Sequence, residues 1–183
     1  MLVDYKVLKL HLKDDVYPFG EYPCQKHTRE IVRAIILDRD KYLFVEITRD
    51  DIFASSLTYI ETSGGGVEEG ENLEEAIRRE LREELGIEVN ILGEIAVVED
   101  DYNLILRHNV QHYFLVEKTK EVASHQTEDE LYKFHMRRLT LTYEEALAYY
   151  EKNKKEKLTH LIYQREVPVL QYAHELVGRR HDL

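Results

Sequence analysis

Three consecutive glycines followed by a short, strongly acidic segment constrain the fold of this chain more than any other feature. Residues 63–87 read SGGGVEEGENLEEAIRRELREELGI. Glycines in a row permit positive φ angles and let the bare backbone approach a ligand closely. Asn72 and Glu75 have the spacing of a capping box, so we expect a helix over about 73–85.

The expected helix has an apolar face that also contains acidic residues. On a wheel of about 100° per residue, one arc holds Ala76, Ile77, Leu81 and Leu85. Glu80 and Glu84 fall inside this arc, at about 340° and 20°, and Glu83 falls at its edge. Carboxylates spaced three and four residues apart repel one another, and burying them is costly unless a cation compensates. Oxygen-rich sites of this kind suit Mg²⁺, Mn²⁺ or Ca²⁺.

Composition places the chain among globular proteins. Its 183 residues are 43% hydrophobic and 33% charged, which predicts a single domain with its own core. No stretch approaches the roughly 18 to 20 apolar residues of a membrane helix, and the alternating, charged N-terminus does not resemble a signal peptide. Cys24 is alone, which excludes an internal disulfide, and we assign it no role. These features together predict a cytoplasmic protein.

The net charge argues against nucleic acid as a partner. A formal charge of −11 disfavours binding to a phosphate backbone. The short basic clusters, at 152–157 and at Arg179 and Arg180, are interpreted as solvated helix ends.

Apolar and alternating runs predict strands before and after the acidic helix, followed by two more helices. The strand candidates are residues 29–37, 41–48, 57–62, 89–100 and 107–118, the first two as a hairpin. Residues 121–134 are expected to be an acidic loop with a possible strand at its end. Thr142 and Glu145 open a helix that continues to about Asn153. A last helix begins near Leu161, and Pro168 is expected to kink or split it. This pattern predicts an α+β sandwich.

Residues 65–87 match the Nudix box, G-x5-E-x7-R-E-U-x-E-E-x-G-U, in which U is aliphatic. The fixed positions are filled by Gly65, Glu71, Arg79, Glu80, Leu81, Glu83, Glu84, Gly86 and Ile87. The chain therefore resembles the Nudix hydrolases. The resemblance implies a single domain over 1–183, with the family's α/β/α sandwich and mixed central sheet. Residues 1–26 are a possible edge-strand extension.

The resemblance also implies a reaction and its residues. The expected activity is hydrolysis of a diphosphate bond in a nucleoside diphosphate linked to another group. By position, Glu80, Glu83 and Glu84 would bind Mg²⁺ or Mn²⁺ with the Gly64 carbonyl, and Arg79 would complete the catalytic set. Gly65, Glu71 and Gly86 would be structural, with Glu71 bracing the loop through Arg79. Ser63 replaces a proline found in many members, and it is expected to touch no ligand.

The general base and the substrate stay open. The base is either a glutamate of the box or one in a later loop, where Glu128 and Glu130 are candidates. Tyr102 is a candidate for stacking on a base, whereas His108 and His112 are interpreted as satisfied polar residues on a strand. Nucleoside triphosphates, dinucleoside polyphosphates, nucleotide sugars and ADP-ribose all fit the family.

Two other readings are weighed against an active enzyme. One is a silent Nudix domain that senses a nucleotide metabolite, but degenerate boxes mark such modules and this box is intact. The other is an acidic interaction helix, which the inward direction of Glu80 and Glu84 disfavours. The chain is expected to act as a monomer or a homodimer.

Overall fold

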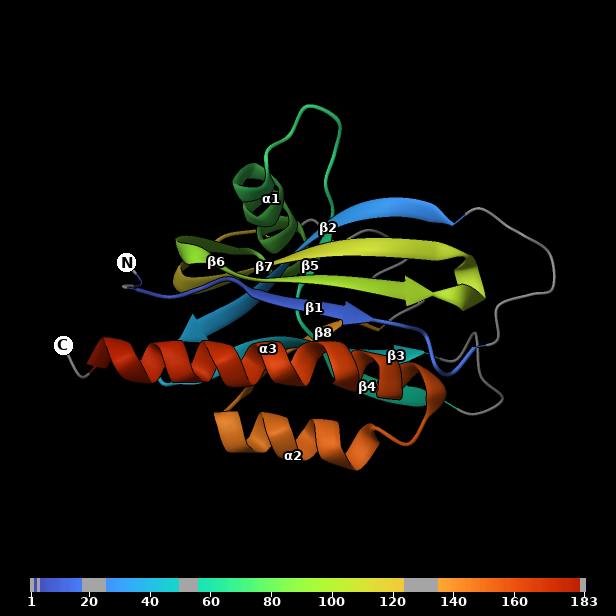
Figure 1. Ribbon diagram of the computed structural model, residues 1–183. Helices are drawn as coiled ribbons and strands as arrows, with labels where there is room; N and C mark the ends of the chain where they lie inside the picture. Colours follow the sequence, from blue (N-terminus) through green and yellow to red (C-terminus); the bar gives the residue numbers. More distant parts are fainter. Residues whose placement is uncertain (1, 3, 18–25, 50–55, 124–134, 182–183) are drawn as a thin grey trace.

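The computed structural model describes residues 2, 4–17, 26–49, 56–123 and 135–181 (Figure 1). The strands are β1 (Leu8–Leu12), β2 (His27–Asp38), β3 (Lys41–Arg49), β4 (Leu57–Glu61), β5 (Gly64–Gly66), β6 (Ile87–Tyr102), β7 (Arg107–Glu121) and β8 (Arg137–Leu141). The helices are α1 (Leu73–Leu85), α2 (Tyr143–Asn153) and α3 (Lys157–His181), with a 3-10 turn at Asn103–Ile105. None of the helices in the described ranges is long and apolar enough to cross a membrane.

The strands that the structure describes form one mixed sheet. Its order is β1-β6-β7-β2-β3-β4, with β5 paired to β2 and β8 paired to β3. The β1–β6 and β2–β7 pairs are parallel, and the other pairs are antiparallel. The parallel β2–β7 pair lies at the centre of the order, and the middle of each strand is mostly buried, whereas residues 27–30 of β2 and 119–121 of β7 are exposed.

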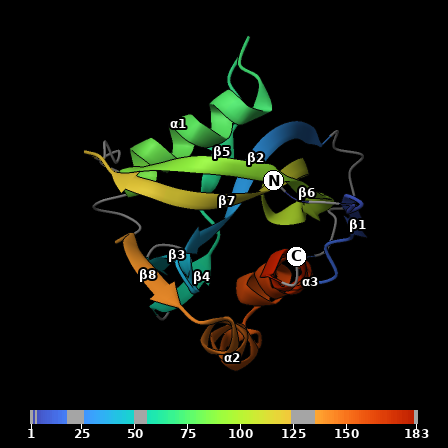
Figure 2. The ribbon, with the colours of Figure 1, turned by 90° about the vertical axis from the view of Figure 1, so that its left-hand side faces the viewer.

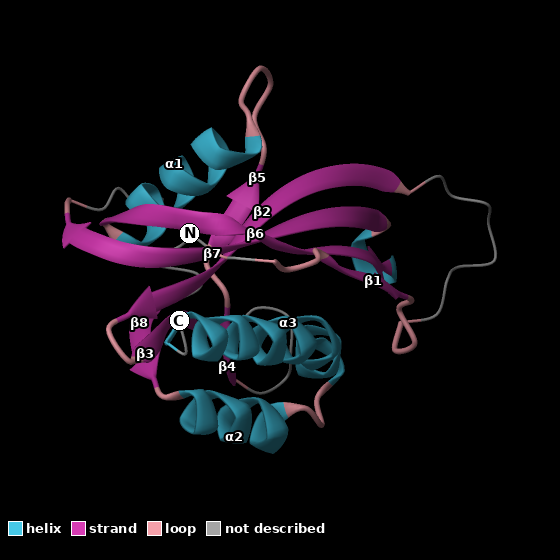
Figure 3. Cartoon of the chain, turned by 60° about the vertical axis from the view of Figure 1, so that its left-hand side comes forward, coloured by secondary structure: helices cyan, strands magenta, loops and turns pink. Residues whose placement is uncertain are grey.

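The helices cover opposite faces of this sheet, as Figures 2 and 3 show. Alternation along β2 explains how one strand serves both layers. Val32, Ala34 and Ile36 belong to the cluster that contains the apolar face of α1. Ile35 and Leu37 belong to the larger cluster beneath α2 and α3. The predicted α+β sandwich is therefore confirmed.

Most predicted elements lie where the sequence pattern placed them. The hairpin is present, with Asp38 paired to Lys41 across a tight turn in which Arg39 has a φ of 64°. Both capping boxes form, so α1 and α2 begin at the expected residues. The apolar face of α1 is buried as the wheel predicts, with 0 to 2% exposure for Ala76, Ile77, Leu81 and Leu85.

The last helix differs from its prediction. It begins at Lys157 instead of near Leu161, and Pro168 lies inside one continuous helix. Proline removes only the hydrogen bond to the carbonyl of Gln164. The turns around it stay in place because Val167 and Val169 are buried beneath the sheet.

Two short strands escape the sequence pattern. The three glycines, for which no strand was predicted, form β5 against β2. β8 pairs with β3 at residues 137–141, where no strand was predicted, and the end of the 121–134 stretch, where a strand was expected, lies outside the described residues. β1 lies at one edge of the sheet, where it pairs with β6 of the same chain.

Candidate metal and phosphate site

Helix α1 is held in position at both ends. The side-chain oxygen of Asn72 accepts a hydrogen bond from the backbone amide of Glu75. The Glu75 carboxylate accepts one from the backbone amide of Asn72, and each bond is 3.0 Å long. Gly86 closes the helix with a left-handed φ of 61°, and its amide bonds to the carbonyl of Arg82 at 3.1 Å. Both ends satisfy backbone groups that a helix terminus leaves unpaired. The direction in which each glutamate leaves the helix is therefore fixed.

The glycines bring bare backbone between β2 and α1. Gly64 has a φ of 147°, and a Cβ there would lie 2.0 Å from the carbonyl oxygen of Val32. A Cβ on Gly65 would lie 2.4 Å from the carboxylate of Glu80. A side chain at Gly64 would thus force the two strands apart, and one at Gly65 would displace a carboxylate.

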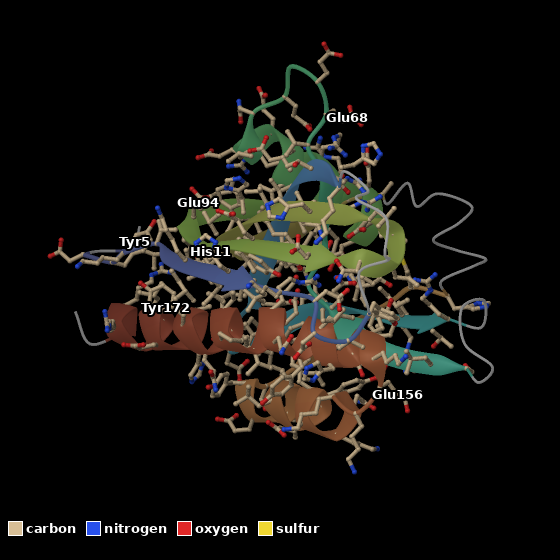
Figure 4. The ribbon with its side chains drawn as sticks, turned by 45° about the vertical axis from the view of Figure 1, so that its right-hand side comes forward. Tyr5, His11, Glu68, Glu94, Glu156 and Tyr172 are labelled. Atoms are coloured by element: carbon tan, nitrogen blue, oxygen red, sulfur yellow. The ribbon has the colours of Figure 1, made fainter. Side chains whose placement is uncertain are left out.

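Arg79 ties the loop to the helix. Its Nε and Nη2 donate to the two oxygens of Glu71, each at 2.9 Å, and Nη2 also donates to the carbonyl of Gly66 at 3.0 Å. A two-point pair of this kind fixes orientation as well as distance. The loop that it anchors projects away from the sheet and carries Glu68 (Figure 4). The salt bridge expected from the resemblance is therefore present.

Arg79 also contacts two of the expected metal ligands. Its Nη1 donates to Glu80 at 2.8 Å and to Glu83 at 3.2 Å. The Glu80 side chain is 14% exposed, whereas the Glu83 side chain is 46% exposed. One guanidinium thus compensates part of the negative charge of the helix face.

Glu84 points to the junction of β4 and β5. Its Oε2 accepts hydrogen bonds from the Ser63 hydroxyl and from the Gly64 amide, the latter at 3.1 Å. Burial raises the pKa of Glu84 to about 7, and the charge of Glu80 acts in the same direction. The hydrogen bonds from Ser63 and Gly64 oppose this rise without cancelling it. The surroundings therefore leave the negative charge of Glu84 incompletely compensated.

The donors suit a hard divalent cation, although they do not converge as the sequence predicted. Within the described ranges, no three Asp, Glu, His or Cys side chains lie close enough together to hold a metal ion. Arg79 explains the difference because it draws Glu80 and Glu83 toward itself, while Ser63 and Gly64 hold Glu84. The carboxylate oxygens and the raised pKa of Glu84 still fit a cation of the magnesium class.

Comparison with known proteins decides the family. The sequence model of the NUDIX domain matches residues 27–162, which is well over half of the chain. The chain belongs to the NUDIX family. The predicted membership is therefore confirmed, and α1 with its preceding loop is the Nudix motif.

The match to relatives with known names extends over only part of this chain and part of each relative. The chain is 44% identical over 64 residues to the nucleoside triphosphatase NudI of Enterobacter sp. strain 638, covering 34% of this chain and 43% of the relative. It is 46% identical over 59 residues to NudI of Escherichia coli O139:H28, covering 32% and 40%. The chain thus spans less than half the length of these relatives.

Solved structures share the fold over a longer range. The solution structure of the E. coli ORF135 protein is 25% identical, with a TM-score of 0.59, and covers 88% of this chain and 98% of its own. A NUDIX hydrolase from Nitrosomonas europaea is 18% identical, with a TM-score of 0.55, and covers 75% and 87%. The second likeness concerns the fold alone.

Ser63 makes a contact that its sequence position did not predict. It was expected to touch no ligand, but its hydroxyl donates to Glu84, which is one of the residues expected to bind the metal. Ser63 is 1% exposed, so this bond is shielded from water. The residue that departs from the common Nudix pattern therefore helps to hold one of the carboxylates of the motif.

Tyr102, Glu128 and Glu130 were the candidates outside the Nudix motif. Tyr102 ends β6 and packs against Tyr17, with ring centroids 5.8 Å apart. Glu128, Glu130 and Cys24 lie outside the described residues. The interpretation of His108 and His112 as polar residues with hydrogen-bond partners is confirmed. His108 contacts Asp101 at 3.0 Å, and His112 contacts Glu94 at 2.7 Å and Glu30 at 3.2 Å.

The sequence did not predict a buried network of charged side chains. Glu61 accepts from Arg33 at 2.8 Å and also from Arg165, whose Nε donates to Glu166 at 3.0 Å. Glu166, which is 0% exposed, also accepts the hydroxyl of Tyr113 at 2.8 Å. The one signal in the sequence was Arg33, a charge inside an otherwise apolar strand run. Nothing local indicated that its partners come from β4 and α3.

Proposed function

We propose that this protein hydrolyses a diphosphate bond in a small nucleotide-type substrate with the help of a divalent cation. The observation that carries the proposal is the complete Nudix motif, in which Glu80, Glu83 and Glu84 leave one helix beside a glycine strand. Family membership supports the reaction class, and the name of the NudI relatives supports a nucleoside triphosphate among the substrates to be tried.

The residues of the motif have separate tasks in this proposal. Glu80, Glu83, Glu84 and the Gly64 carbonyl would hold Mg²⁺ or Mn²⁺. When bound, such an ion neutralises phosphate oxygens and lowers the pKa of water. Arg79 keeps the loop and helix together, so the carboxylates stay opposite the glycine backbone. Ser63 orients Glu84 through its hydroxyl.

One glutamate must also accept the proton of the attacking water. General-base assistance contributes about 10² to 10⁴-fold to a rate. The candidates are the glutamates of the motif, together with Glu128 and Glu130. Conservative replacement of each by glutamine, followed by measurement of kcat against pH, distinguishes them, because loss of the base removes the acidic limb of the profile.

A substrate panel tests the proposed function. We expect phosphate or pyrophosphate release from at least one compound among nucleoside triphosphates, dinucleoside polyphosphates, nucleotide sugars and ADP-ribose. Release should require Mg²⁺ or Mn²⁺, stop on addition of EDTA, and return when metal is restored in excess. Binding of a nucleotide with no turnover of any compound under either metal would instead favour the sensing module.

Replacing Ser63 by alanine tests whether its hydroxyl positions Glu84. Loss of a hydrogen bond to a charged group should raise the Mg²⁺ concentration for half-maximal activity by about tenfold. kcat at saturating metal should change by less than about twofold, because no ligand is removed. The measurement is a metal titration of the initial rate.

Thr62→Ala is the matched control for Ser63→Ala. It removes the adjacent hydroxyl, whose oxygen makes no hydrogen bond within the described ranges. Equal metal requirements for Ser63→Ala and Thr62→Ala would show that the Ser63 hydroxyl has no part in positioning Glu84.

A further inference from the structure

Thr62 and Ser63 connect β4 to β5, and both residues are buried. β4 pairs with β3, whereas β5 pairs with β2, so this connection passes from one strand pair to another. Two hydrogen-bond donors to Glu84 are found in it or directly after it, the Ser63 hydroxyl and the Gly64 amide. The position of the connection therefore affects the direction of a carboxylate that is expected to bind the metal.

The backbone of Thr62 is held on both sides by charged side chains. Its carbonyl accepts a hydrogen bond from Nη1 of Arg33 at 2.8 Å. Its amide donates to Oε2 of Glu166 at 3.3 Å. The next carbonyl is held by β2, because Ser63 accepts from the Ala34 amide at 3.0 Å. At Thr62, charged side chains thus take the place of a neighbouring strand as hydrogen-bond partners.

Glu166 is itself fixed by the buried network. It belongs to α3, which lies on the face of the sheet opposite α1 (Figures 2 and 3), and it is 0% exposed. Its Oε1 accepts from the Tyr113 hydroxyl at 2.8 Å and from Nε of Arg165 at 3.0 Å. Because one oxygen has these two donors and the other has the Thr62 amide, the carboxylate is held in a single orientation.

A buried network of charged side chains is a weak source of stability. Hydrophobic residues of similar volume often stabilise a core equally well or better, because burying charges costs desolvation energy. What the charges do supply is a fixed arrangement of donors and acceptors. In this protein, one end of that arrangement is bonded to the residue that precedes Ser63. The network is therefore placed to orient Glu84 from a distance.

We propose that Glu166 is a positioning residue for Glu84 and acts through the backbone of Thr62 and the hydroxyl of Ser63. Helix α3 thereby supports a carboxylate of the Nudix helix from the opposite face of the sheet. This inference rests on the proposed function, since it concerns Glu84 as a ligand of the divalent cation.

Glu166→Gln tests the inference through the affinity for Mn²⁺, measured from the electron paramagnetic resonance signal of the free ion without substrate. Glutamine offers one acceptor oxygen, whereas Arg165 and the Thr62 amide donate to different oxygens of Glu166. The charged guanidinium is the stronger donor, so the glutamine nitrogen should face Thr62 and that bond should be lost. We expect the Mn²⁺ affinity to fall by about threefold or more.

Tyr113→Phe is the matched control, because it removes a hydrogen bond from the other oxygen of the same buried carboxylate. It should lower the urea midpoint, as Glu166→Gln should, but leave the Mn²⁺ affinity within about twofold of the wild type. Equal losses of affinity in the two variants would indicate a general loosening of the core and overturn the inference. If Glu166→Gln does not fold, Glu166→Asp keeps the charge beside Arg165 and withdraws it from Thr62, with the same expected loss.

Combination with Ser63→Ala tests the route. Because Glu166 is proposed to act through the Ser63 hydroxyl, Glu166→Gln should lower the Mn²⁺ affinity less in the Ser63→Ala background than in the wild type. Unchanged affinity in Glu166→Gln, or equal losses in both backgrounds, would overturn the inference. Absence of hydrolysis across the substrate panel would count against the proposed function and would leave these affinities unaffected.

Discussion

Glu83→Gln is expected to lower kcat by at least about 10²-fold, with Mg²⁺ present and with the best substrate of the panel. The substitution keeps the shape of the side chain and removes the negative charge that would face the cation. Because Glu83 is 46% exposed and Arg79 retains its contacts with Glu71 and Glu80, the fold should be kept. The measurement is the steady-state rate, with circular dichroism to check folding.

Glu74→Gln provides the control for a change of charge on the same helix. Glu74 is exposed in the first turn of α1 and is not part of the fixed Nudix pattern. Its replacement should leave kcat within about twofold of the wild type. A Glu83→Gln variant that is as active as Glu74→Gln would remove Glu83 from the proposed catalytic set.

Glu61→Gln is expected to lower the free energy of unfolding by about 3 to 5 kcal/mol, because it leaves two buried arginines without a shared counter-charge. Glu61 is bonded to Arg33 and Arg165, whose side chains are 13% and 10% exposed. Urea unfolding monitored by circular dichroism measures the effect. Glu151→Gln removes an exposed pair with Lys154 and should leave the urea midpoint unchanged.

The same variant has a predicted pH dependence. Burial favours a higher pKa for Glu61, but the charges of Arg33 and Arg165 outweigh it and lower the pKa. A lowered pKa in the folded state stabilises the protein above the unfolded value of about 4.3 and ceases to do so as pH falls through the folded value. The difference in the free energy of unfolding between wild type and Glu61→Gln should therefore be largest near neutral pH and should disappear at acidic pH. A difference that stays constant down to pH 3 would contradict this assignment.

The Nudix helix could be predicted closely because local rules determine it. Its start depends on Asn72 and Glu75, its end on Gly86, and its buried face on a spacing that a wheel reproduces. The same reasoning identified Glu80 and Glu84 as charges on an apolar face. It could not predict that Arg79 would hold Glu80 and Glu83 together, because that depends on the rotamer of a long side chain.

Features that depend on distant pairing were not predictable in this way. The three glycines become a strand only because β2 offers an edge at Arg33 and its neighbours. The buried network joins β2, β4 and α3, and its bonded partners Glu61 and Arg165 are 104 residues apart in sequence. Pro168 was expected to interrupt α3, but the buried residues on either side of it hold the helix together.

Manganese binding tests the central claim most directly, since it asks whether the Nudix glutamates hold a divalent cation at all. Titration of the protein with Mn²⁺, followed by the electron paramagnetic resonance signal of the free ion, gives the affinity without any substrate. We expect saturable uptake by the wild type and by Glu74→Gln. In Glu84→Gln and Glu83→Gln, the affinity should be weaker by about tenfold or more. Uptake that is absent from the wild type, or equal in all four proteins, would contradict the account.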